Sequence, residues 1–235
     1  MNYHAGMTLH RETLPETLPA EPLAVVADWL AEAIRSARQP NPNAMVLATV
    51  DEHGQPSARV VLCKDLQPVP GYLTFFTNYD SRKGRELAAN PQVAAVFHWD
   101  ALHRQVRIEG RVEASPAADS DRYFASRAWQ SRIGAWASAQ SQPVASRTEL
   151  HAAVVRTAAR FGTPVPDDES VPDPGTPIPR PPHWGGYRLW ATAVELWVEG
   201  AGRVHDRARW TRSLNIPAAG APIVPGAWSC TRLQP

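Results

Sequence analysis

Residues 43–64 read NAMVLATVDEHGQPSARVVLCK, a pattern that predicts two β-strands joined by a tight turn. Residues 44–50 and 57–63 are apolar and rich in β-branched side chains, and the sequence DEHG between them favours a turn. The second strand carries a cation at each end, Arg59 and Lys64. Since buried strands rarely hold full charges, these side chains are either solvated at the strand ends or face an anion.

A second basic cluster, Ser81-Arg82-Lys83, opens a helix that is predicted to end near Asn90-Pro91, because proline stops a helix. Ser81 can cap this helix. The free N–H groups of a helix N-terminus and two cations together make a good phosphate site. The other interpretation is an ordinary basic helix start on the surface, and these residues alone leave both interpretations open.

The composition bounds the class of protein. The chain has 235 residues, 43% of them hydrophobic, which suffices for a sizeable core. A formal net charge of +1 gives no reason to expect nucleic acid as a partner. Two cysteines, Cys63 and Cys230, make no disulfide framework, and the histidines lack metal-ligand spacing, so no metal site is predicted. Without a membrane-length apolar run or a signal-peptide core, we expect a soluble cytoplasmic protein with no membrane partner.

Periodicity and turn residues predict a β-rich α+β fold. Helices are expected at 22–38, 81–90, 117–126, 128–138 and 146–161. Besides the opening hairpin, strands are expected at 72–77, 93–99, 104–114, 187–198, 203–211 and 228–233. About eight strands without βαβ alternation favour an antiparallel barrel or α+β fold over a Rossmann-type sheet.

The domain organisation follows from the segments that lack periodicity. Residues 1–20 predict a flexible N-terminal arm, and 21–235 predict a single domain. Residues 163–182 contain eight prolines and several acidic residues, which predicts a surface loop without a core of its own. Residues 213–225 form a second loop with proline and glycine.

The sequence contains no GxGxxG after a strand, Walker loop, HExxH, CxxC or GxSxG, so a nucleotide-dependent or zinc-hydrolytic enzyme is unsupported. One further cluster is RVHDR at 203–207. On a strand, alternation places Arg203, His205 and Arg207 on one face. Such a row is either a solvated edge or a site for a phosphorylated ligand.

Ten segments in this order resemble the pyridoxamine 5′-phosphate oxidase (pyridoxine 5′-phosphate oxidase) family: AMVLATVDEHGQP, RVVLCK, FFTNYDSRKGREL, RQVRIEGRVE, RYFASR, SRIGAWASAQS, HWGGYR, ELW, RVHDR and RLQP. The resemblance covers roughly residues 22–212 and the last few. It implies an FMN-binding split β-barrel with flanking helices, working as a homodimer with flavin at the subunit interface. Members oxidise pyridoxamine or pyridoxine 5′-phosphate to pyridoxal 5′-phosphate and reduce oxygen to hydrogen peroxide.

The resemblance also implies roles for individual residues. The expected FMN-binding residues are Arg59, Val60, Val61, Leu62, Lys64, Phe76, Thr77, Arg82, Lys83, Gln105, Gln140, Ser141, Trp197 and Arg207, with Thr77, Arg82 and Lys83 at the phosphate. The substrate phosphate is expected at Lys64, Tyr123, Arg127 and Ser131. Arg203 and His205 are expected to frame the substrate ring as catalytic residues.

Strict alternation places Arg59 and Lys64 on opposite faces, so a bulge or a strand end must reconcile their shared role. The chain also departs from the family pattern. The Arg-x-x-Tyr element of the N-terminal arm is not legible, with only Tyr3 to stand in for it, and Asn41 occupies a position where aspartate is frequent. The loops at 163–182 and 213–225 are longer than usual. These departures bear on substrate preference and turnover more than on flavin binding.

Two alternative functions stay open. One is a related FMN-dependent oxidase of secondary metabolism, of the phenazine-pathway type, and the other is a non-enzymatic flavin-binding protein. The presence of Tyr123, Arg127, Ser131, Arg203 and His205 together argues against both alternatives, because neither needs a site for a substrate phosphate.

Overall fold

The computed structural model of the protein describes residues 12–166, 170–216 and 221–235. This part of the chain contains five α-helices: α1 (Pro22–Ser36), α2 (Arg82–Ala89), α3 (Ala117–Ala125), α4 (Trp129–Ala137) and α5 (Arg147–Phe161). Its eleven strands are β1 (Ala44–Val50), β2 (Pro56–Leu62), β3 (Asp65–Gln67), β4 (Tyr72–Asn78), β5 (Gln92–Trp99), β6 (Arg104–Ala114), β7 (Trp184–Val198), β8 (Asp206–Thr211), β9 (Leu214–Asn215), β10 (Val224–Pro225) and β11 (Ser229–Leu233). Two short 3₁₀ helices are η1 (Asp100–Leu102) and η2 (Ala201–Arg203). No helix in these ranges is long and apolar enough to span a membrane.

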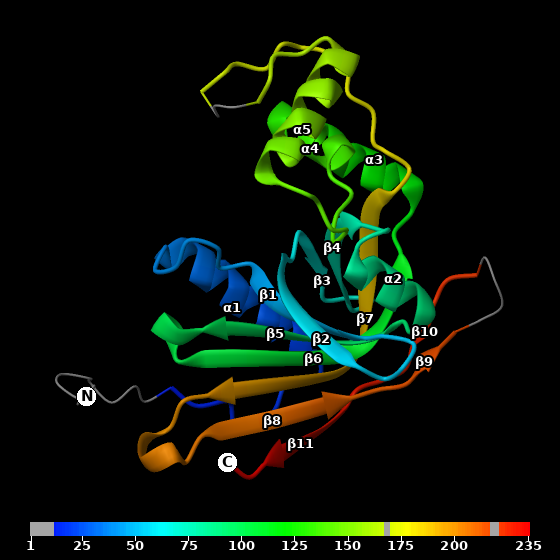
Figure 1. Ribbon diagram of the computed structural model, residues 1–235. Helices are drawn as coiled ribbons and strands as arrows, with labels where there is room; N and C mark the ends of the chain where they lie inside the picture. Colours follow the sequence, from blue (N-terminus) through cyan, green and yellow to red (C-terminus); the bar gives the residue numbers. More distant parts are fainter. Residues whose placement is uncertain (1–11, 167–169, 217–220) are drawn as a thin grey trace.

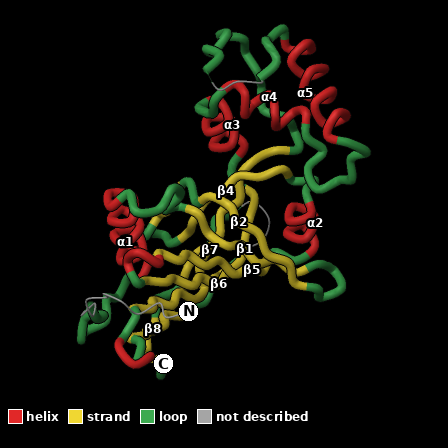
Figure 2. The backbone as a smooth tube through the Cα atoms, turned by 60° about the vertical axis from the view of Figure 1, so that its left-hand side comes forward, coloured by secondary structure: helices red, strands yellow, loops and turns green. Residues whose placement is uncertain are grey.

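Nine strands form one antiparallel sheet in the order β11-β8-β7-β6-β5-β1-β2, with β3 and β4 attached through β7. The long strand β7 organises this sheet. Its first half pairs with β4 and its second half with β8, while β6 pairs with it along most of its length. Figure 1 shows β7 running from the group of α3, α4 and α5 down to β8, and Figure 2 shows α1 and α2 on either side of the strands. The predicted β-rich antiparallel α+β fold is confirmed.

The sheet is irregular where β6 shifts register against β7, between Glu109 and Gly110. A Cβ atom on Gly110 would lie 2.0 Å from the carbonyl oxygen of Trp190. Only glycine permits this approach of two backbones, and such bulges increase the local twist of a sheet. The bulge thus lets β6 and β7 bend together.

Two hydrophobic clusters hold the fold together. The larger cluster packs Leu23, Val26 and Trp29 of α1 against buried side chains of the sheet such as Leu47 and Phe97. The smaller cluster joins α3, α4, the proline-rich loop and the start of β7, through Phe124, Trp129, Ile133, Ile178 and Trp184. Burial of each large apolar side chain contributes about 1.5–3 kcal/mol to folding. The three helices at one end therefore have a core of their own, and β7 connects it to the main core.

The opening hairpin forms as predicted, with Val46 opposite Val60 and Ala44 opposite Leu62. Strand β2 ends at Leu62, and the backbone N–H of Lys64 donates to the carbonyl oxygen of Thr74 at 2.8 Å. Lys64 therefore lies beyond the strand, where alternation no longer constrains it. A strand end thus removes the conflict between the faces of Arg59 and Lys64.

Other boundaries differ from the prediction. Strand β8 begins at Asp206, and Arg203 lies in η2 with a φ of +66°. The predicted row of Arg203, His205 and Arg207 on one strand face is wrong, because the turn after β7 continues through His205. Helix α3 begins at Ala117 and its N-cap residue is Pro116. The strands β3, β9 and β10 were not predicted, since pieces of two or three residues show no periodicity.

Of the three segments expected to be loops or arms, residues 1–20 and 163–182 contain neither helix nor strand where they are described, yet both pack against the fold. The third, 213–225, contains the short strands β9 and β10. In residues 12–20, Leu14 is buried and its N–H donates to Asp206 Oδ2 at 2.8 Å. Glu12 forms a two-pronged ion pair with the buried Arg104, at 2.6 and 2.8 Å. In the proline-rich loop, Ile178 is buried in the smaller cluster. The predicted stand-in Tyr3 lies outside the described residues.

Candidate active site

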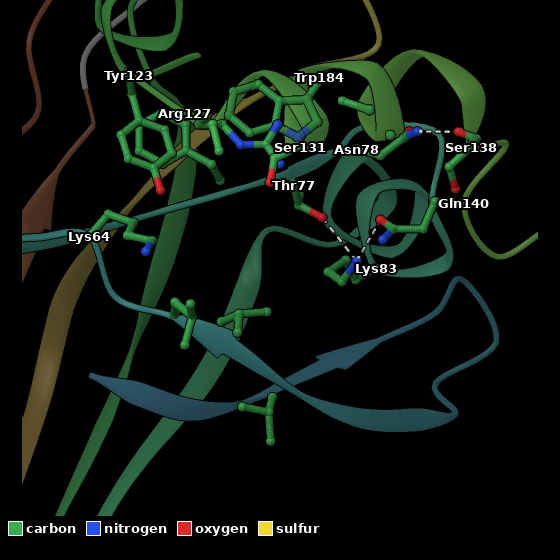
Figure 3. Close-up of a pocket in the computed structure, with 17 residues that line it drawn as sticks. Lys64, Thr77, Asn78, Lys83, Tyr123, Arg127, Ser131, Ser138, Gln140 and Trp184 are labelled. Atoms are coloured by element: carbon green, nitrogen blue, oxygen red, sulfur yellow. Dashed lines mark hydrogen bonds between the residues drawn. The ribbon is translucent and has the colours of Figure 1, made fainter. Parts of the chain in front are cut away.

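A cavity of about 750 Å³ opens between β2, β4, α2, α4 and the start of β7 (Figure 3). Its size is within the range of cofactor and ligand sites. Eleven residues predicted from the sequence line it: Val60, Val61, Leu62, Lys64, Phe76, Thr77, Lys83, Tyr123, Arg127, Ser131 and Gln140. Six more lining residues were not predicted: Asn78, Ala128, Gly134, Ala135, Ser138 and Trp184.

One end of the cavity is formed by Lys83, Thr77 and Gln140, which we call the Lys83 group. The Lys83 ammonium donates to Thr77 Oγ1 at 2.9 Å, to Ser81 Oγ at 3.1 Å and to Gln140 Oε1 at 3.2 Å. Ser81 caps α2 as predicted, because its Oγ accepts from the N–H of Gly84 at 3.3 Å. A cation beside a helix N-terminus is a ready site for a phosphate.

Burial lowers the pKa of Lys83 from its ordinary value of 10.5 to about 8; the charge of Arg59 acts in the same direction and that of Glu86 opposes it. An ammonium group in this position lacks part of its hydration. A phosphate arriving at the cavity would replace that hydration and stabilise the charge.

The other end of the cavity is formed by Lys64, Tyr123, Arg127 and Ser131, which we call the Arg127 group. The Tyr123 ring stacks on Phe76 at 4.0 Å between centroids, and Lys64 Nζ lies 5.9 Å from the centre of the Tyr123 ring. The Arg127 guanidinium lies 4.8 Å from the centre of a Trp184 ring. Figure 3 shows Tyr123, Arg127 and Ser131 together on the side of the cavity away from Gln140. The cavity thus carries two separate sets of cationic and hydroxyl groups.

Arg59 and Arg82 do not line this cavity. Both bind the buried carboxylate of Glu86, Arg59 Nη2 at 3.1 Å and Arg82 Nε at 2.8 Å. Thr49 and Ser57 also donate to this carboxylate. Burial by itself raises the pKa of Glu86, but the hydrogen bonds from Thr49, Ser57 and Arg82 and the charge of Arg59 outweigh it and lower the pKa to about 2. Arg82 instead lines a second cavity of about 470 Å³ with Asp51, Glu52, Arg85, Glu86 and Ala89.

Five further predicted residues lie at the other end of β7, and we call them the distal group: Gln105, Trp197, Arg203, His205 and Arg207. Trp197 stands between Gln105 on β6 and Arg207 on β8 in the strand register. The His205 ring lies 4.6 Å from the Trp197 ring. Thirteen positions of β7 separate Trp184 from Trp197, which is roughly 40 Å of strand. One protomer therefore brings the Lys83 and Arg127 groups together but not the distal group.

Ser141 follows Gln140 with a φ of +70° and does not line the main cavity. Among the lining residues that were not predicted, five stand inside the quoted segments HWGGYR, FFTNYDSRKGREL and SRIGAWASAQS, so the sequence did carry a signal for them: Trp184, Asn78, Gly134, Ala135 and Ser138. Ala128 stands outside the quoted segments, and its small side chain leaves no chemical signature. No group of three His, Cys, Asp or Glu side chains in the described ranges is placed to hold a metal ion.

A curled antiparallel sheet and a cofactor-sized cavity with cationic side chains at both ends define the class: a ligand-binding protein on a split-barrel scaffold. Residues 30–161 match the family model "Pyridoxamine 5′-phosphate oxidase", and residues 184–235 match "Pyridoxine 5′-phosphate oxidase C-terminal dimerisation region". The chain belongs to the pyridoxamine 5′-phosphate oxidase family. Its cofactor is FMN, it is an oxidoreductase, and the dimerisation region supports the predicted homodimer.

Relatives and solved structures agree with this assignment. The chain is 50% identical over 207 residues to a pyridoxine/pyridoxamine 5′-phosphate oxidase of Burkholderia mallei, covering 88% of this chain and 86% of the relative. A protein of the same name from Burkholderia lata is 47% identical over 215 residues, 92% and 89% of the two chains. The structure of PhzG from Burkholderia lata 383, in complex with tetrahydrophenazine-1-carboxylic acid, superposes with a TM-score of 0.76 at 28% identity, over 92% and 94% of the chains. An FMN-binding protein from Nostoc punctiforme has the same fold, with a TM-score of 0.64 at 15% identity over 93% and 100%. The predicted split-barrel fold is thus confirmed.

Proposed function

We propose that this protein oxidises pyridoxamine 5′-phosphate, pyridoxine 5′-phosphate or both to pyridoxal 5′-phosphate, and reduces oxygen to hydrogen peroxide. The main observation behind the proposal is that one cavity has a group of cationic and hydroxyl side chains at each end, the Lys83 group and the Arg127 group, and that each group can bind an anion. A phosphorylated cofactor lying beside a phosphorylated substrate needs two such groups. The names of the relatives at about half identity support the same substrates.

The residues of the cavity fit FMN. The Lys83 group and the N-terminus of α2 match the phosphate of the cofactor in charge and in hydrogen-bond donors. Val60, Val61, Leu62 and Phe76 supply an apolar wall for a flat ring system. When bound, FMN supplies a ring that accepts two electrons from the substrate and passes them to oxygen.

The Arg127 group would hold the substrate phosphate. Arg127 Nη1 is buried and has no hydrogen-bond partner among the described residues. Unsatisfied buried donors cost free energy, so a phosphate that accepts from this group is stabilised. Lys64 adds a second charge, while Tyr123 and Ser131 add hydroxyl donors.

The distal group would complete the site from the partner protomer, since one protomer holds it roughly 40 Å of strand away from the cavity. The N–H of Gly200 donates to His205 Nδ1 at 3.2 Å, so a neutral His205 carries its proton on Nε2. That nitrogen can donate to a substrate atom. Arg203 is exposed in the turn beside it and can contact the same ring.

In this scheme the protein contributes alignment more than acid–base strength. The Arg127 group fixes one end of the substrate and the distal group fixes the ring against the flavin. Holding two reactants in attack geometry can contribute several kcal/mol to lowering the barrier, about 7–11 in the best cases.

A second candidate is an oxidase of the phenazine-pathway type. The structural similarity to PhzG supports this candidate. The ligand in that structure carries a carboxylate and no phosphate. A substrate of that kind would leave most donors of the Arg127 group without a partner. A third candidate is a flavin-binding protein without turnover.

The test is to purify the protein, measure bound FMN, and follow peroxide formation with pyridoxamine 5′-phosphate, pyridoxine 5′-phosphate and tetrahydrophenazine-1-carboxylic acid. We expect peroxide with one or both phosphates, and Arg127→Ala should retain FMN but lose this activity. Oxidation of the phenazine precursor alone would favour the second candidate. If the protein binds FMN but oxidises none of the three compounds, the result would favour the third candidate, a flavin-binding protein without turnover.

A further inference from the structure

Trp184 lines the cavity but has no role in the proposed chemistry so far. We propose that Trp184 is a positioning residue: its indole holds the guanidinium of Arg127 in the orientation that receives the substrate phosphate. The inference rests on the proposed function, since it gives Trp184 a role in binding the substrate phosphate at that site.

The Arg127 side chain is oriented by contacts with aromatic rings. Its guanidinium carbon lies 4.8 Å from the centre of a Trp184 ring and 5.5 Å from the centre of the Phe124 ring. In the described part of the chain Arg127 makes no side-chain hydrogen bond, and its Nη1 atom is buried. Contacts with aromatic rings therefore orient this side chain, whereas Lys83 at the opposite end of the cavity is held by hydrogen bonds.

The surroundings of Trp184 make it a rigid support. Only 7% of the residue is exposed. Phe76 stacks on it with centroids 5.5 Å apart and an angle of 9° between the planes, and Phe124 meets it edge-on at 5.1 Å. Its backbone is tied to the strand register opposite Asn78, and its carbonyl oxygen accepts from Arg180 Nη1 at 2.6 Å. An indole fixed on several sides can fix a guanidinium above it.

The physical gain is preorganisation. A cation over the face of an indole is attracted by the ring, more so when it is desolvated. Burial lowers the pKa of Arg127, and the neighbouring Tyr123 acts in the opposite direction, which agrees with a guanidinium that has lost part of its hydration. An arginine already held in one orientation loses less conformational freedom when it binds a phosphate. Loss of Trp184 should therefore weaken phosphate binding without touching the flavin.

The experiment measures binding of pyridoxal 5′-phosphate and of pyridoxal to the FMN-loaded protein by the change in flavin fluorescence, together with KM and kcat for the oxidised substrate. The variants are Trp184→Leu, Arg127→Ala and the double variant. Trp136→Leu is the matched control, because Trp136 also stacks under an arginine, Arg160 at 4.6 Å, in the same group of helices but outside the cavity. Trp184→Phe is a milder variant that keeps an aromatic ring if the leucine variant folds poorly.

We expect Trp184→Leu to weaken binding of pyridoxal 5′-phosphate and raise KM by about threefold to tenfold, the range of one partly desolvated cation–π contact. Pyridoxal binding, kcat and FMN content should change little, and Trp184→Phe should act in the same direction by less. In the Arg127→Ala background the Trp184 effect should vanish, since Trp184 acts through Arg127. Additive effects in the double variant, equal losses for pyridoxal, or the same loss in Trp136→Leu would overturn the inference. Because binding is read without turnover, an inactive wild-type protein would contradict the proposed function and leave this test readable.

Discussion

At the scale of single residues, Glu86 is the buried charge that connects three elements. Its carboxylate on α2 accepts from Thr49 of β1, from Ser57 and Arg59 of β2, and from Arg82 of its own helix. A buried carboxylate is stable only when its lone pairs are satisfied. Glu86 thus fixes two of the arginines that were expected at the flavin.

The first prediction concerns the stability of Glu86→Gln. The pKa of Glu86 falls from its ordinary 4.5 to about 2 in the folded protein. A lowered carboxyl pKa stabilises the fold above pH 4.5, and that contribution, about 3 kcal/mol, is lost as the pH falls from 4.5 to 2. Glu86→Gln should therefore be less stable at pH 7 and lose less stability over that interval. Urea unfolding of the wild type and of Glu86→Gln at a series of pH values measures both effects. If the free energy of unfolding depended on pH in the same way in both proteins, the lowered pKa of Glu86 would be contradicted.

The second prediction concerns Lys83 and FMN affinity. Since the pKa of Lys83 is about 8 before a phosphate is bound, the ammonium deprotonates above that pH and the affinity for FMN should fall, by up to about tenfold per pH unit. The same shift makes the cofactor-free fold gain stability from this group as the pH rises from 8 to 10.5. Fluorescence titration of FMN between pH 7 and 10 tests this, with Lys83→Arg as the control that stays charged. An equal slope in the two proteins would remove Lys83 from the phosphate site.

At the scale of elements, the bulge in β6 decides how the sheet bends. The third prediction is that Gly110→Ala lowers the free energy of unfolding by about 1–3 kcal/mol, because the new Cβ meets backbone that cannot move aside. Gly134→Ala is the matched control: apart from its chain neighbours and the nearby backbone of its own helix α4, no atom lies within 4 Å of its added Cβ. Alanine there should instead stabilise the helix by about 0.5–1 kcal/mol. Chemical unfolding of both variants measures the difference, and losses of the same size would show that close packing at Gly110 is unimportant.

At the scale of the whole molecule, the long strand β7 divides the predicted site between its two ends. A cavity completed by the partner, as proposed above, would explain why both ends carry predicted site residues. The closed two-fold symmetry of a homodimer would then give two equivalent composite sites.

The fourth prediction tests this arrangement by complementation. Arg127→Ala and Arg203→Ala should each be nearly inactive and still bind FMN. A heterodimer of the two chains, isolated through two different tags, should regain about half of the wild-type activity, because one of its two sites receives both intact residues. If each site belonged to one chain, every site in the heterodimer would hold a lesion. An inactive heterodimer would therefore refute the shared site.

The sequence by itself determined the local elements and much of the site. Alternation and the DEHG turn specify β1 and β2, Ser81 specifies the start of α2, and the alternation in β6 puts Val106 and Ile108 in the core. These features depend on neighbours a few positions apart, so a sequence pattern contains them. The lining residues Lys64, Thr77, Lys83, Tyr123 and Arg127 could be predicted because they stand in segments that resemble a known family.

Only the tertiary structure decided the partners of the charges and the division of the site. Glu86 has the spacing of an ordinary helix residue, yet it binds Thr49 and Arg59 at separations of 37 and 27 positions. Arg203 looked like part of a strand, but the backbone turns there with a positive φ. Trp184 stands in the quoted segment HWGGYR, but its place under Arg127 depends on the packing of α3 against β7. Contacts between distant segments depend on how whole elements pack, and a local pattern of residue types holds no record of that packing.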